Sequence, residues 1–340
     1  MNDFSTITLG VLGIDHAHIH GMLSHMLAQG CHIKGWWTDG SPNTQPAFEQ
    51  AFPDIPFIAD KERILEDTDI DMVLISAIPS QRAALAVEAM QAGKDVMVDK
   101  PGCTTLEQLE WIKQTVQQTG RIWSVNFSER FEVPAVAKAE QLVAQGAIGN
   151  VKQTLGTGPH RQGLSGRPDW YFDRQAYGGI LTDIGSHQID QFLHFTQSEQ
   201  VEIKHAHAEN TTLSQHPGIQ DFGEVILHGD RGHGYIRVDW FTPDALPVWG
   251  DGRLTILGDE GYIECRKYID IGNGNLANQL IYANHRTIEH IDCQDTALPY
   301  FPRLCADILM RTQTAVSQAH TFKVMELAIA AQALAEKGLK

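Results

Sequence analysis

The sequence predicts an α/β protein with two domains: a doubly wound parallel sheet, followed by an α+β domain with an open, mainly antiparallel sheet. Up to residue 125, short apolar runs alternate with amphipathic helical segments, as in a parallel sheet covered on both faces. Beyond that residue, short alternating segments separated by turn residues predict antiparallel strands. At 340 residues the chain exceeds what one hydrophobic core usually supports. We therefore expect domains at 1–125 and 126–340.

The N-terminal half opens in the β-α-β order of a dinucleotide-binding, or Rossmann, domain. A strand from Ile7 to Gly13 leads into a helix from about His18 to Gln29, and a second strand runs from Ile33 to Thr38. Asp39 follows this strand, about where an acidic residue binds a ribose diol. No arginine follows within residues 40–43 to neutralise a 2′-phosphate. We therefore expect NAD as the cofactor and consider NADP the weaker candidate.

The glycine motif that contacts the pyrophosphate is altered in this chain. If Gly13 is its first glycine, Asp15 and His18 occupy the second and third glycine positions. His16 and His20 have the i, i+4 spacing of a metal site, next to Asp15. The alternative that we favour places His16 and His18 in the phosphate loop, with no bound metal.

Further strands and helices alternate up to residue 125. We expect strands at 72–76, 95–98 and 122–125, and helices at 81–92 and 105–119. Asp99, Lys100 and Pro101 follow one strand, and ligands of parallel sheets bind beyond the carboxyl ends of the strands. The proline biases Lys100 away from helix, so its ammonium can face this crevice. The alternative for Lys100 is an ordinary exposed lysine.

In the second half, the segment Gly178 to Asp190 predicts a helix that carries ionisable groups. Asp183, His187 and Asp190 share an arc of roughly 60° on such a helix. A carboxylate one turn before an imidazole can hold its tautomer and stabilise its charged form, as a general base requires. The alternative is a solvated polar stripe after a capping glycine pair.

In the rest of the second half, the sequence predicts the strands of a sheet and a C-terminal helical segment. The expected elements are a helix at 134–145, strands at 151–157, 201–209, 221–228, 234–241, 253–257, 262–268 and 279–282, and helical pattern at 304–337. Between them, the loop His160–Tyr171 combines hydrogen-bond donors with aromatic residues, which suits a hydroxylated substrate. From it we take His160, Arg161 and Trp170 as substrate-binding candidates. The alternative is a surface loop held by its own Arg–Asp pairs.

Charge and composition exclude several classes of function. The formal net charge is −16 and no lysine or arginine cluster occurs, so nucleic acid is not an expected partner. No apolar run approaches the length of a membrane span, and residues 1–6 do not resemble a secretory signal. The five cysteines are far apart, which argues against a disulfide framework or a zinc motif. We expect a cytoplasmic protein with a small-molecule partner.

Two motifs about 80 residues apart identify a family. Residues 92–101, AGKDVMVDKP, are similar to a family motif aGkhVxxEKP, and residues 178–190 are similar to GGxLxDxGxHxxD. The chain therefore resembles the glucose–fructose oxidoreductase, inositol dehydrogenase and MocA family of nicotinamide-dependent oxidoreductases. Three positions depart from it: Asp15 replaces a glycine, Asp99 replaces a glutamate, and Ala83 stands where the family often has histidine.

The resemblance implies a Rossmann domain, a second domain whose sheet commonly makes subunit contacts, and a site between them. It assigns catalytic roles to Lys100, Asp183 and His187, and implies cofactor contacts from Gly13, Asp15, His16, His18, Asp39, Pro79, Asp99 and Lys100. Asp190 joins the substrate-binding candidates. It implies no metal, and a homodimer or homotetramer.

We expect an NAD(H)-dependent dehydrogenase that oxidises a secondary alcohol of a sugar, cyclitol or related polyol, or reduces the ketone. Two alternatives stay open. One is a redox-assisted lyase or glycosidase, in which NAD is reduced and reoxidised within one turnover. The other is a non-catalytic sugar or nucleotide sensor on the same fold.

Overall fold

The computed structural model describes residues 4–337, whose contacts group into two compact units. Unit 1 comprises Met1–Asn126, Ser165–Gly178 and Pro299–Glu326, and unit 2 comprises Phe127–Leu164, Gly179–Leu298 and Leu327–Lys340. The sequence-based division at 125/126 treats each domain as one continuous segment. In the structure, residues 165–178 and 299–326 also belong to unit 1, because most of their contacts lie there.

Unit 1 is built on a parallel five-stranded sheet, which confirms the predicted Rossmann-like half. Its strands are β1 Thr8–Leu12, β2 His32–Trp37, β3 Met72–Ile75, β4 Asp95–Asp99 and β5 Trp123–Asn126, in the order β2-β1-β3-β4-β5. On the outer side of β2, its residue Trp36 pairs with Phe57 through one parallel bridge. This bridge stands where a Rossmann sheet has its outer third strand. The strand order therefore reverses between β1 and β3, which is where ligands of such sheets bind.

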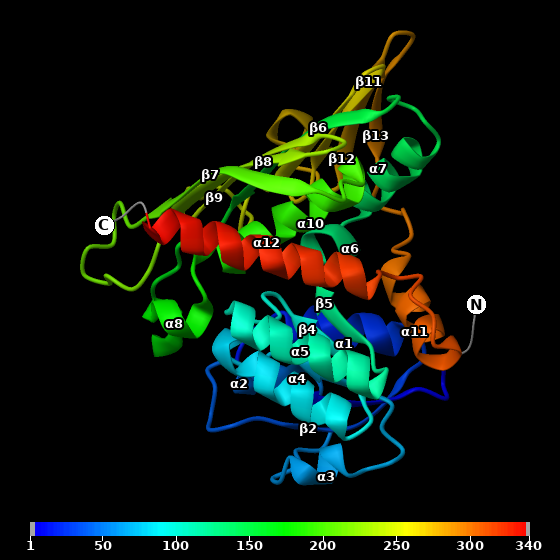
Figure 1. Ribbon diagram of the computed structural model, residues 1–340, viewed down its shortest axis with the longest axis vertical. Coiled ribbons are helices and arrows are strands. Elements are labelled where there is room, and N and C mark those ends of the chain that lie inside the picture. The colour runs from blue at the N-terminus through cyan, green and yellow to red at the C-terminus, as the bar shows by residue number, and fades with distance from the viewer. Residues whose placement is uncertain (1–3, 338–340) are drawn as a thin grey trace. The chain divides into compact units, whose positions relative to one another are not determined.

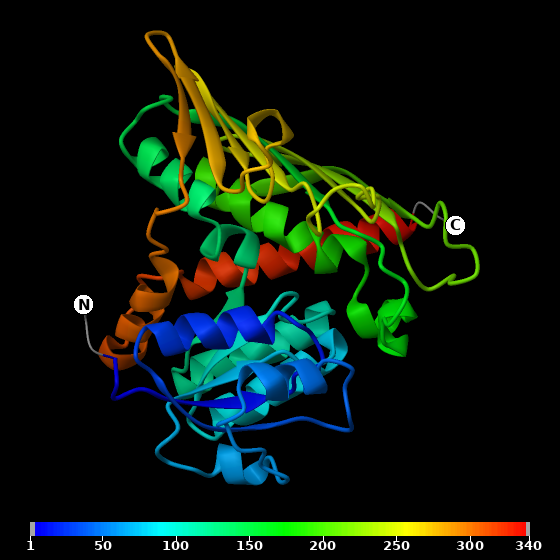
Figure 2. The same cartoon turned by 180° about the vertical axis from the view of Figure 1, so that it is seen from behind.

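Helices cover both faces of this sheet. The α4 and α5 helices lie together on one face (Figure 1), and α1 lies on the other (Figure 2). Local sequence sets the ends of α5: Thr105 accepts a hydrogen bond from the Gln108 N–H at 3.2 Å, and Gly120 ends the helix in the left-handed conformation. The helices of unit 1 are α1 Ile19–Ala28, α2 Gln45–Ala51, α3 Glu62–Leu65, η1 Pro79–Gln81, α4 Arg82–Gln91, α5 Leu106–Thr119, η2 Asp169–Phe172, α8 Arg174–Tyr177 and α11 Tyr300–Met310.

Unit 2 contains an eight-stranded, mostly antiparallel sheet, as predicted. The strands are β6 Val151–Pro159, β7 Val201–Glu209, β8 Phe222–Gly229, β9 His233–Asp239, β10 Arg253–Gly258, β11 Gly261–Arg266, β12 Gln279–Asn284 and β13 Ile288–Asp292, in the order β13-β12-β11-β10-β6-β9-β8-β7. Only β6 and β9 pair in parallel among these strands. The sequence did not indicate β13, because its residues are almost all exposed and show no apolar alternation.

Helices pack against this sheet and form the core of unit 2. They are α6 Ser128–Phe131, α7 Pro134–Ala144, α9 Ile180–Asp183 and α10 Gly185–Thr196, with η3 Ile271–Asn273 in a loop. The α10 helix contacts β6 and β9, and α7 contacts β11 and β12. Between α7 and the sheet, a buried apolar cluster includes Val136, Ala139, Ile148, Leu254, Ile263 and Leu280.

The predicted helix over 178–190 is wrong as a single element. Gly178 and Gly179 have φ values of 91° and 87° and lie outside it, and the helix breaks at Ile184 between α9 and α10. The Ser186 hydroxyl donates to the Asp183 carbonyl oxygen at 3.1 Å, whereas the His187 N–H bonds to the Ile184 oxygen. The serine thus takes the carbonyl that an unbroken α-helix would offer to His187.

The predicted C-terminal helical stretch is likewise two helices, α11 and α12 Gln318–Lys337. Arg311 ends α11 in the left-handed conformation, with φ 56°. The following turn is fixed by Asp307, whose carboxylate accepts from the N–H groups of Thr314 and Ala315, both at 2.8 Å. Within residues 4–337, no helix has the length and hydropathy needed to cross a membrane.

Candidate functional site

The loop from β1 to α1 is held against the end of β3 by close backbone contact at Gly13. Gly13 has φ +81°, and a Cβ there would lie 2.6 Å from the Cβ of Ala77. Its N–H bonds to the Trp37 oxygen at 2.7 Å, and its oxygen accepts from Ser76 at 3.1 Å. Only glycine satisfies both the dihedral angle and the space. Gly13 therefore has the properties of the first glycine of a dinucleotide-binding turn.

Asp15 turns its carboxylate onto the protein chain. The backbone N–H groups of Asp15 and Ile78 favour its ionised form. Burial raises the pKa of Asp15 to about 6, with a further upward contribution from Asp39, although Arg82 opposes the shift. The side chain at this glycine position is therefore a carboxyl group that changes charge near neutral pH.

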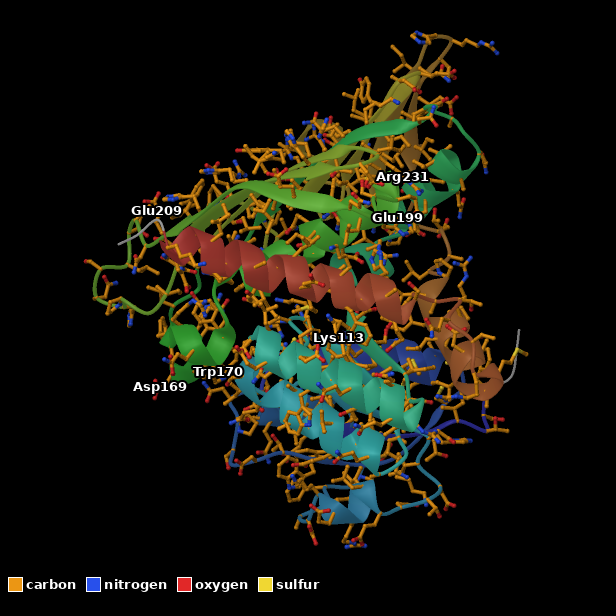
Figure 3. The ribbon with its side chains drawn as sticks, viewed as in Figure 1. Lys113, Asp169, Trp170, Glu199, Glu209 and Arg231 are labelled. Carbon is orange, nitrogen blue, oxygen red and sulfur yellow. The ribbon has the colours of Figure 1, made fainter. Side chains whose placement is uncertain are left out.

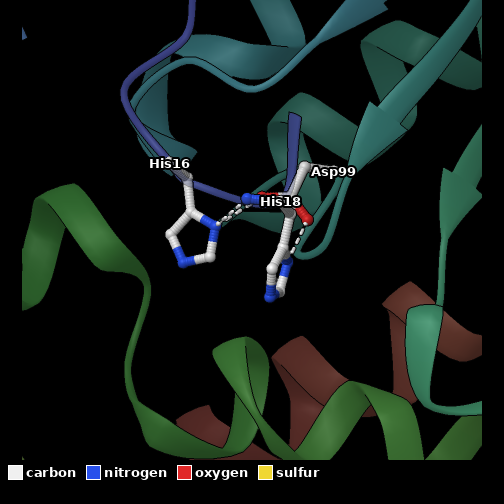
Figure 4. Close-up of side chains that lie close together, drawn as sticks. All are labelled: His16, His18 and Asp99. Carbon is white, nitrogen blue, oxygen red and sulfur yellow. Dashed lines mark hydrogen bonds and ion pairs between the residues drawn. The ribbon is translucent and has the colours of Figure 1, made fainter. Parts of the chain in front are cut away.

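His16, His18 and Asp99 form one cluster at the ends of β1 and β4 (Figure 4). The Nδ1 atom of His18 lies 2.8 Å from Oδ1 of Asp99, and Nδ1 of His16 lies 3.2 Å from Oδ2. Burial by itself raises the pKa of Asp99, but His18, Arg82 and His16 together lower it well below its usual range. Burial and the neighbouring His18 lower the pKa of His16 to about 4, against the opposing effect of Asp99. Asp99 is thus an ionised carboxylate shared by two imidazoles.

Arg82 anchors this cluster, although no motif in the sequence singled it out. Its side chain is fully buried, and NH2 donates to Oδ2 of Asp99 at 2.9 Å. Its other N–H groups donate to the main-chain oxygens of Ala77, Asp99, Lys100 and Pro101, at 2.5 to 3.1 Å. Arg82 thereby fixes the turn in which Lys100 lies. The only signal in the sequence was its position seven residues after the apolar strand β3.

The remaining candidates of unit 1 also lie at the carboxyl ends of its strands. Lys100 follows β4 and is 4% exposed, so it is not the ordinary surface lysine of the alternative interpretation. Pro79 is buried at the start of η1, after β3. Asp39 follows β2 and is exposed. The sheet therefore brings Gly13, Pro79, Asp99 and Lys100 to one edge.

In unit 2, the α9–α10 break positions Asp183 and His187. Both are buried, at 7% and 2% exposed. A carboxylate that the sequence analysis missed, Glu129 on α6, interacts electrostatically with His187. Burial raises the pKa of Glu129, but Lys267 and His187 lower it to about 2. A buried imidazole thus has an ionised carboxylate near it, which no local motif could indicate because 58 residues separate them.

Glu129 is held in a polar network of its own. Its Oε2 atom accepts from Lys267 Nζ at 2.5 Å and from Gln188 Nε2 at 2.9 Å. Lys267 also donates to the amide oxygen of Gln191 at 3.3 Å. Gln188 and Gln191 lie on α10 with His187, so this network fixes the helix that carries the imidazole.

Asp190 is occupied by a protein cation. Arg130 donates to its two oxygens at 2.6 and 2.7 Å, and Asp190 is 0% exposed. Arg130 also lies 3.5 Å from Glu140. This bidentate pair joins α6 to α10, and it argues for a structural role of Asp190 rather than the substrate contact expected from the sequence.

The substrate-loop candidates are divided between the two units. Trp170 lies on η2 of unit 1 (Figure 3), with its ring centroid 6.5 Å from that of His16. His160 and Arg161 follow β6 in unit 2. The guanidinium of Arg161 donates to the backbone oxygens of Leu246 and Val248, the latter at 3.0 Å. Arg161 is therefore held by residues 243–248, which lie outside the loop.

Comparison with known proteins agrees with this geometry. A model of an oxidoreductase family with an NAD-binding Rossmann fold matches residues 8–127, and a model of the GFO/IDH/MocA C-terminal domain matches residues 136–264. A solved structure from Erwinia carotovora atroseptica SCRI1043 is 42% identical, with a TM-score of 0.93, and the match covers 97% of this chain and 98% of that chain.

Two curated relatives are enzymes. The scyllo-inositol 2-dehydrogenase (NAD(+)) of Bacillus subtilis (strain 168) is 29% identical over 210 residues, 60% of this chain and 57% of the relative. The levoglucosan dehydrogenase of Pseudarthrobacter phenanthrenivorans is 33% identical over 137 residues, 39% of this chain and 34% of the relative. The matches thus span less than two thirds of either relative. With both halves of the chain matched and the Rossmann sheet in place, the chain belongs to the GFO/IDH/MocA family of oxidoreductases.

Proposed function

We propose that the protein is an NAD(H)-dependent dehydrogenase that oxidises a secondary alcohol of a sugar, cyclitol or related polyol, or reduces the corresponding ketone. The observation that carries the proposal is the buried imidazole of His187, with the ionised Glu129 near enough to interact with it. A carboxylate near an imidazole stabilises its protonated form, which a general base becomes when it accepts a proton. The dehydrogenase names of the two curated relatives support the same reaction class.

The residues of unit 1 fit a nicotinamide cofactor. Gly13 has no side chain, so the pyrophosphate can come close to the backbone there. Asp39 follows β2, where its carboxylate can accept a hydrogen bond from a ribose hydroxyl. The side chains at the other two glycine positions are held by protein groups, Asp15 by backbone N–H groups and His18 by Asp99. When bound, NAD supplies the hydride acceptor.

Each catalytic candidate has a defined task in this proposal. His187 accepts the proton of the substrate hydroxyl, while Asp183 and Glu129 stabilise the imidazolium. Lys100 donates a hydrogen bond to the developing alkoxide oxygen. Trp170 and His160 contribute to substrate binding. As in the resemblance, we expect a homodimer or homotetramer, which agrees with the exposed apolar side chains of Leu257 and Tyr262, paired between β10 and β11.

A direct assay tests the proposal. The protein is incubated with NAD⁺ and a panel of cyclitols and sugars that includes scyllo-inositol and levoglucosan, while NADH absorbance and substrate loss are followed together. Stoichiometric NADH formation and loss of alcohol is the expected result. Substrate loss without NADH would indicate transient redox chemistry instead. Tight binding of a sugar without any turnover would indicate a sensor.

Cofactor preference should follow Asp39. NAD(H) should bind more tightly than NADP(H), and Asp39→Ser should raise NADP(H) affinity by at least about tenfold. A carboxylate within roughly 4 Å of a dianionic phosphate costs on the order of 1–2 kcal/mol even in water. Fluorescence titration of both cofactors measures this. A wild-type preference for NADP(H) would contradict the role given to Asp39.

Binding of NAD should depend on pH through Asp15. Because burial raises the pKa of Asp15 to about 6, its carboxyl group is neutral below that pH and negative above it. A negative carboxylate repels the pyrophosphate, so NAD affinity should fall by about fivefold as pH rises from 5 to 7, which is on the order of 1 kcal/mol. Asp15→Asn should remove this dependence and bind NAD more tightly at pH 7. Calorimetric titration of both proteins at several pH values measures the effect. A loss of affinity in Asp15→Asn would show that the carboxylate assists binding.

A further inference from the structure

We propose that His16, His18 and Asp99 form a binding site for one divalent transition-metal ion, of the class of Zn²⁺ or Co²⁺. One ligand atom from each residue lies within 4.8 Å of the others. Figure 4 shows the two imidazole rings side by side, each with a nitrogen turned toward Asp99. The proposal concerns unit 1 alone and does not depend on the proposed dehydrogenase activity.

The distances fit ligands of one ion. Zinc binds imidazole nitrogen and carboxylate oxygen at roughly 2.1 Å, so two ligands at tetrahedral or octahedral angles are roughly 3.0–3.4 Å apart. The Nδ1 atoms of His18 and His16 lie 2.8 and 3.2 Å from the oxygens of Asp99. The ligand atoms of the three residues all lie within 4.8 Å of one another, so the two rings must move closer together to bind one ion.

The donor set selects the class of ion. Two imidazole nitrogens and one carboxylate oxygen are ligands for zinc, cobalt, nickel or ferrous iron rather than for magnesium or calcium, which take oxygen ligands. The His16 and His18 side chains are 24% and 34% exposed, so solvent reaches the cluster. Water can therefore complete the coordination, as in sites with three protein ligands.

The carboxylate is already oriented for such a role. Oδ2 of Asp99 accepts from Arg82, with Ser76 Oγ 3.4 Å away, and Oδ1 lies 2.8 Å from Nδ1 of His18. Hydrogen-bonded carboxylates of this kind are typical of metal sites. The positive charge of Arg82 opposes a nearby cation, but four main-chain oxygens also accept from this guanidinium and share its charge.

The cluster differs from the histidine spacing that suggested a metal in the sequence. The His20 ring packs instead against Phe48 and Phe52, at centroid distances of 5.8 and 5.7 Å. The fold instead brings His16 beside His18 and Asp99, and Asp99 lies 81 residues after His18 in the chain. Of the i, i+4 pair, His20 thus makes apolar contacts and only His16 belongs to the proposed ligand set. The ends of β1 and β4 bring that set together.

Titration of the metal alone tests the site. Untagged protein is stripped with chelator and titrated with Zn²⁺ by calorimetry, and Co²⁺ spectra report the ligand field. We expect one ion per chain, and a loss of affinity of more than about tenfold in each of His16→Gln and His18→Gln, since even outer partners of ligands contribute about 10–100-fold. His233→Gln is the matched control, because His228 on β8 and His233 on β9 form another close, exposed imidazole pair, 4.5 Å between centroids.

The outcomes separate cleanly. One-to-one binding that survives His233→Gln and is lost in both cluster variants supports the site. Absence of one-to-one binding by the wild-type protein, or equal affinity in His16→Gln and His18→Gln, overturns it. If a cluster variant does not fold, X-ray absorption of the zinc complex of His233→Gln decides: scattering from two imidazole rings supports the site, and an all-oxygen shell rejects it.

Discussion

His187→Asn should lower kcat/KM for alcohol oxidation by about 10²–10⁴-fold, the usual contribution of a general base. Asparagine keeps a polar group of similar size on α10 but cannot accept the substrate proton. The wild-type kcat/KM should rise with pH through one ionisation, because oxidation requires the neutral imidazole, and the variant should lose this rise. Steady-state kinetics across pH measure both effects.

Two comparisons make this result specific. NAD affinity should barely change in His187→Asn, since the residue belongs to unit 2 and the cofactor contacts that we propose belong to unit 1. His228→Asn, the same change at an exposed residue of β8, should leave kcat/KM unaltered. A His187→Asn protein with wild-type kcat/KM and pH profile would exclude His187 as the base and leave Asp183 as the next candidate.

Asp190→Ala should lower the free energy of unfolding by about 3–5 kcal/mol, the typical cost of leaving one partner of a buried ion pair uncompensated. Arg130 is 6% exposed and donates to both oxygens of Asp190 at 2.6 and 2.7 Å, whereas Glu140 is farther from it at 3.5 Å, so Asp190 is its principal partner and water cannot replace it. Urea denaturation followed by tryptophan fluorescence and circular dichroism measures the change. Replacing both partners, as Arg130→Met with Asp190→Leu, should recover much of the loss because neither charge of the pair then stays buried without the other.

An exposed ion pair provides the control for this measurement. Glu199 and Arg231 pair at the surface, where their side chains are 75% and 52% exposed (Figure 3). Glu199→Ala should therefore change the stability by less than about 1 kcal/mol. If Asp190→Ala kept wild-type stability but raised KM for the alcohol, the substrate role that the sequence suggested for Asp190 would be restored.

The sequence alone determined those features that are encoded by neighbouring residues. Apolar runs and amphipathic segments identified the strands of both sheets except β13, and Thr105 and Gly120 marked the ends of α5. Residues 92–101 and 178–190 identified the family, which the matches to both halves confirm. These features can be read from the sequence because a strand, a cap or a motif depends on residues within a few positions of one another.

Only the tertiary structure decided which side chains share an environment. Asp99 meets His16, His18 and Arg82 because parallel strands bring their carboxyl ends to one edge, and Glu129 interacts with His187 across 58 residues. At the break at Ile184, the Ser186 hydroxyl rather than the His187 N–H bonds to the Asp183 carbonyl oxygen, which hydrophobic periodicity cannot indicate. In the sequence, Asp190 lies on the same helical face as Asp183 and His187. In the structure, its contribution to stability depends on the buried Arg130, and tertiary packing rather than local sequence brings Arg130 to it.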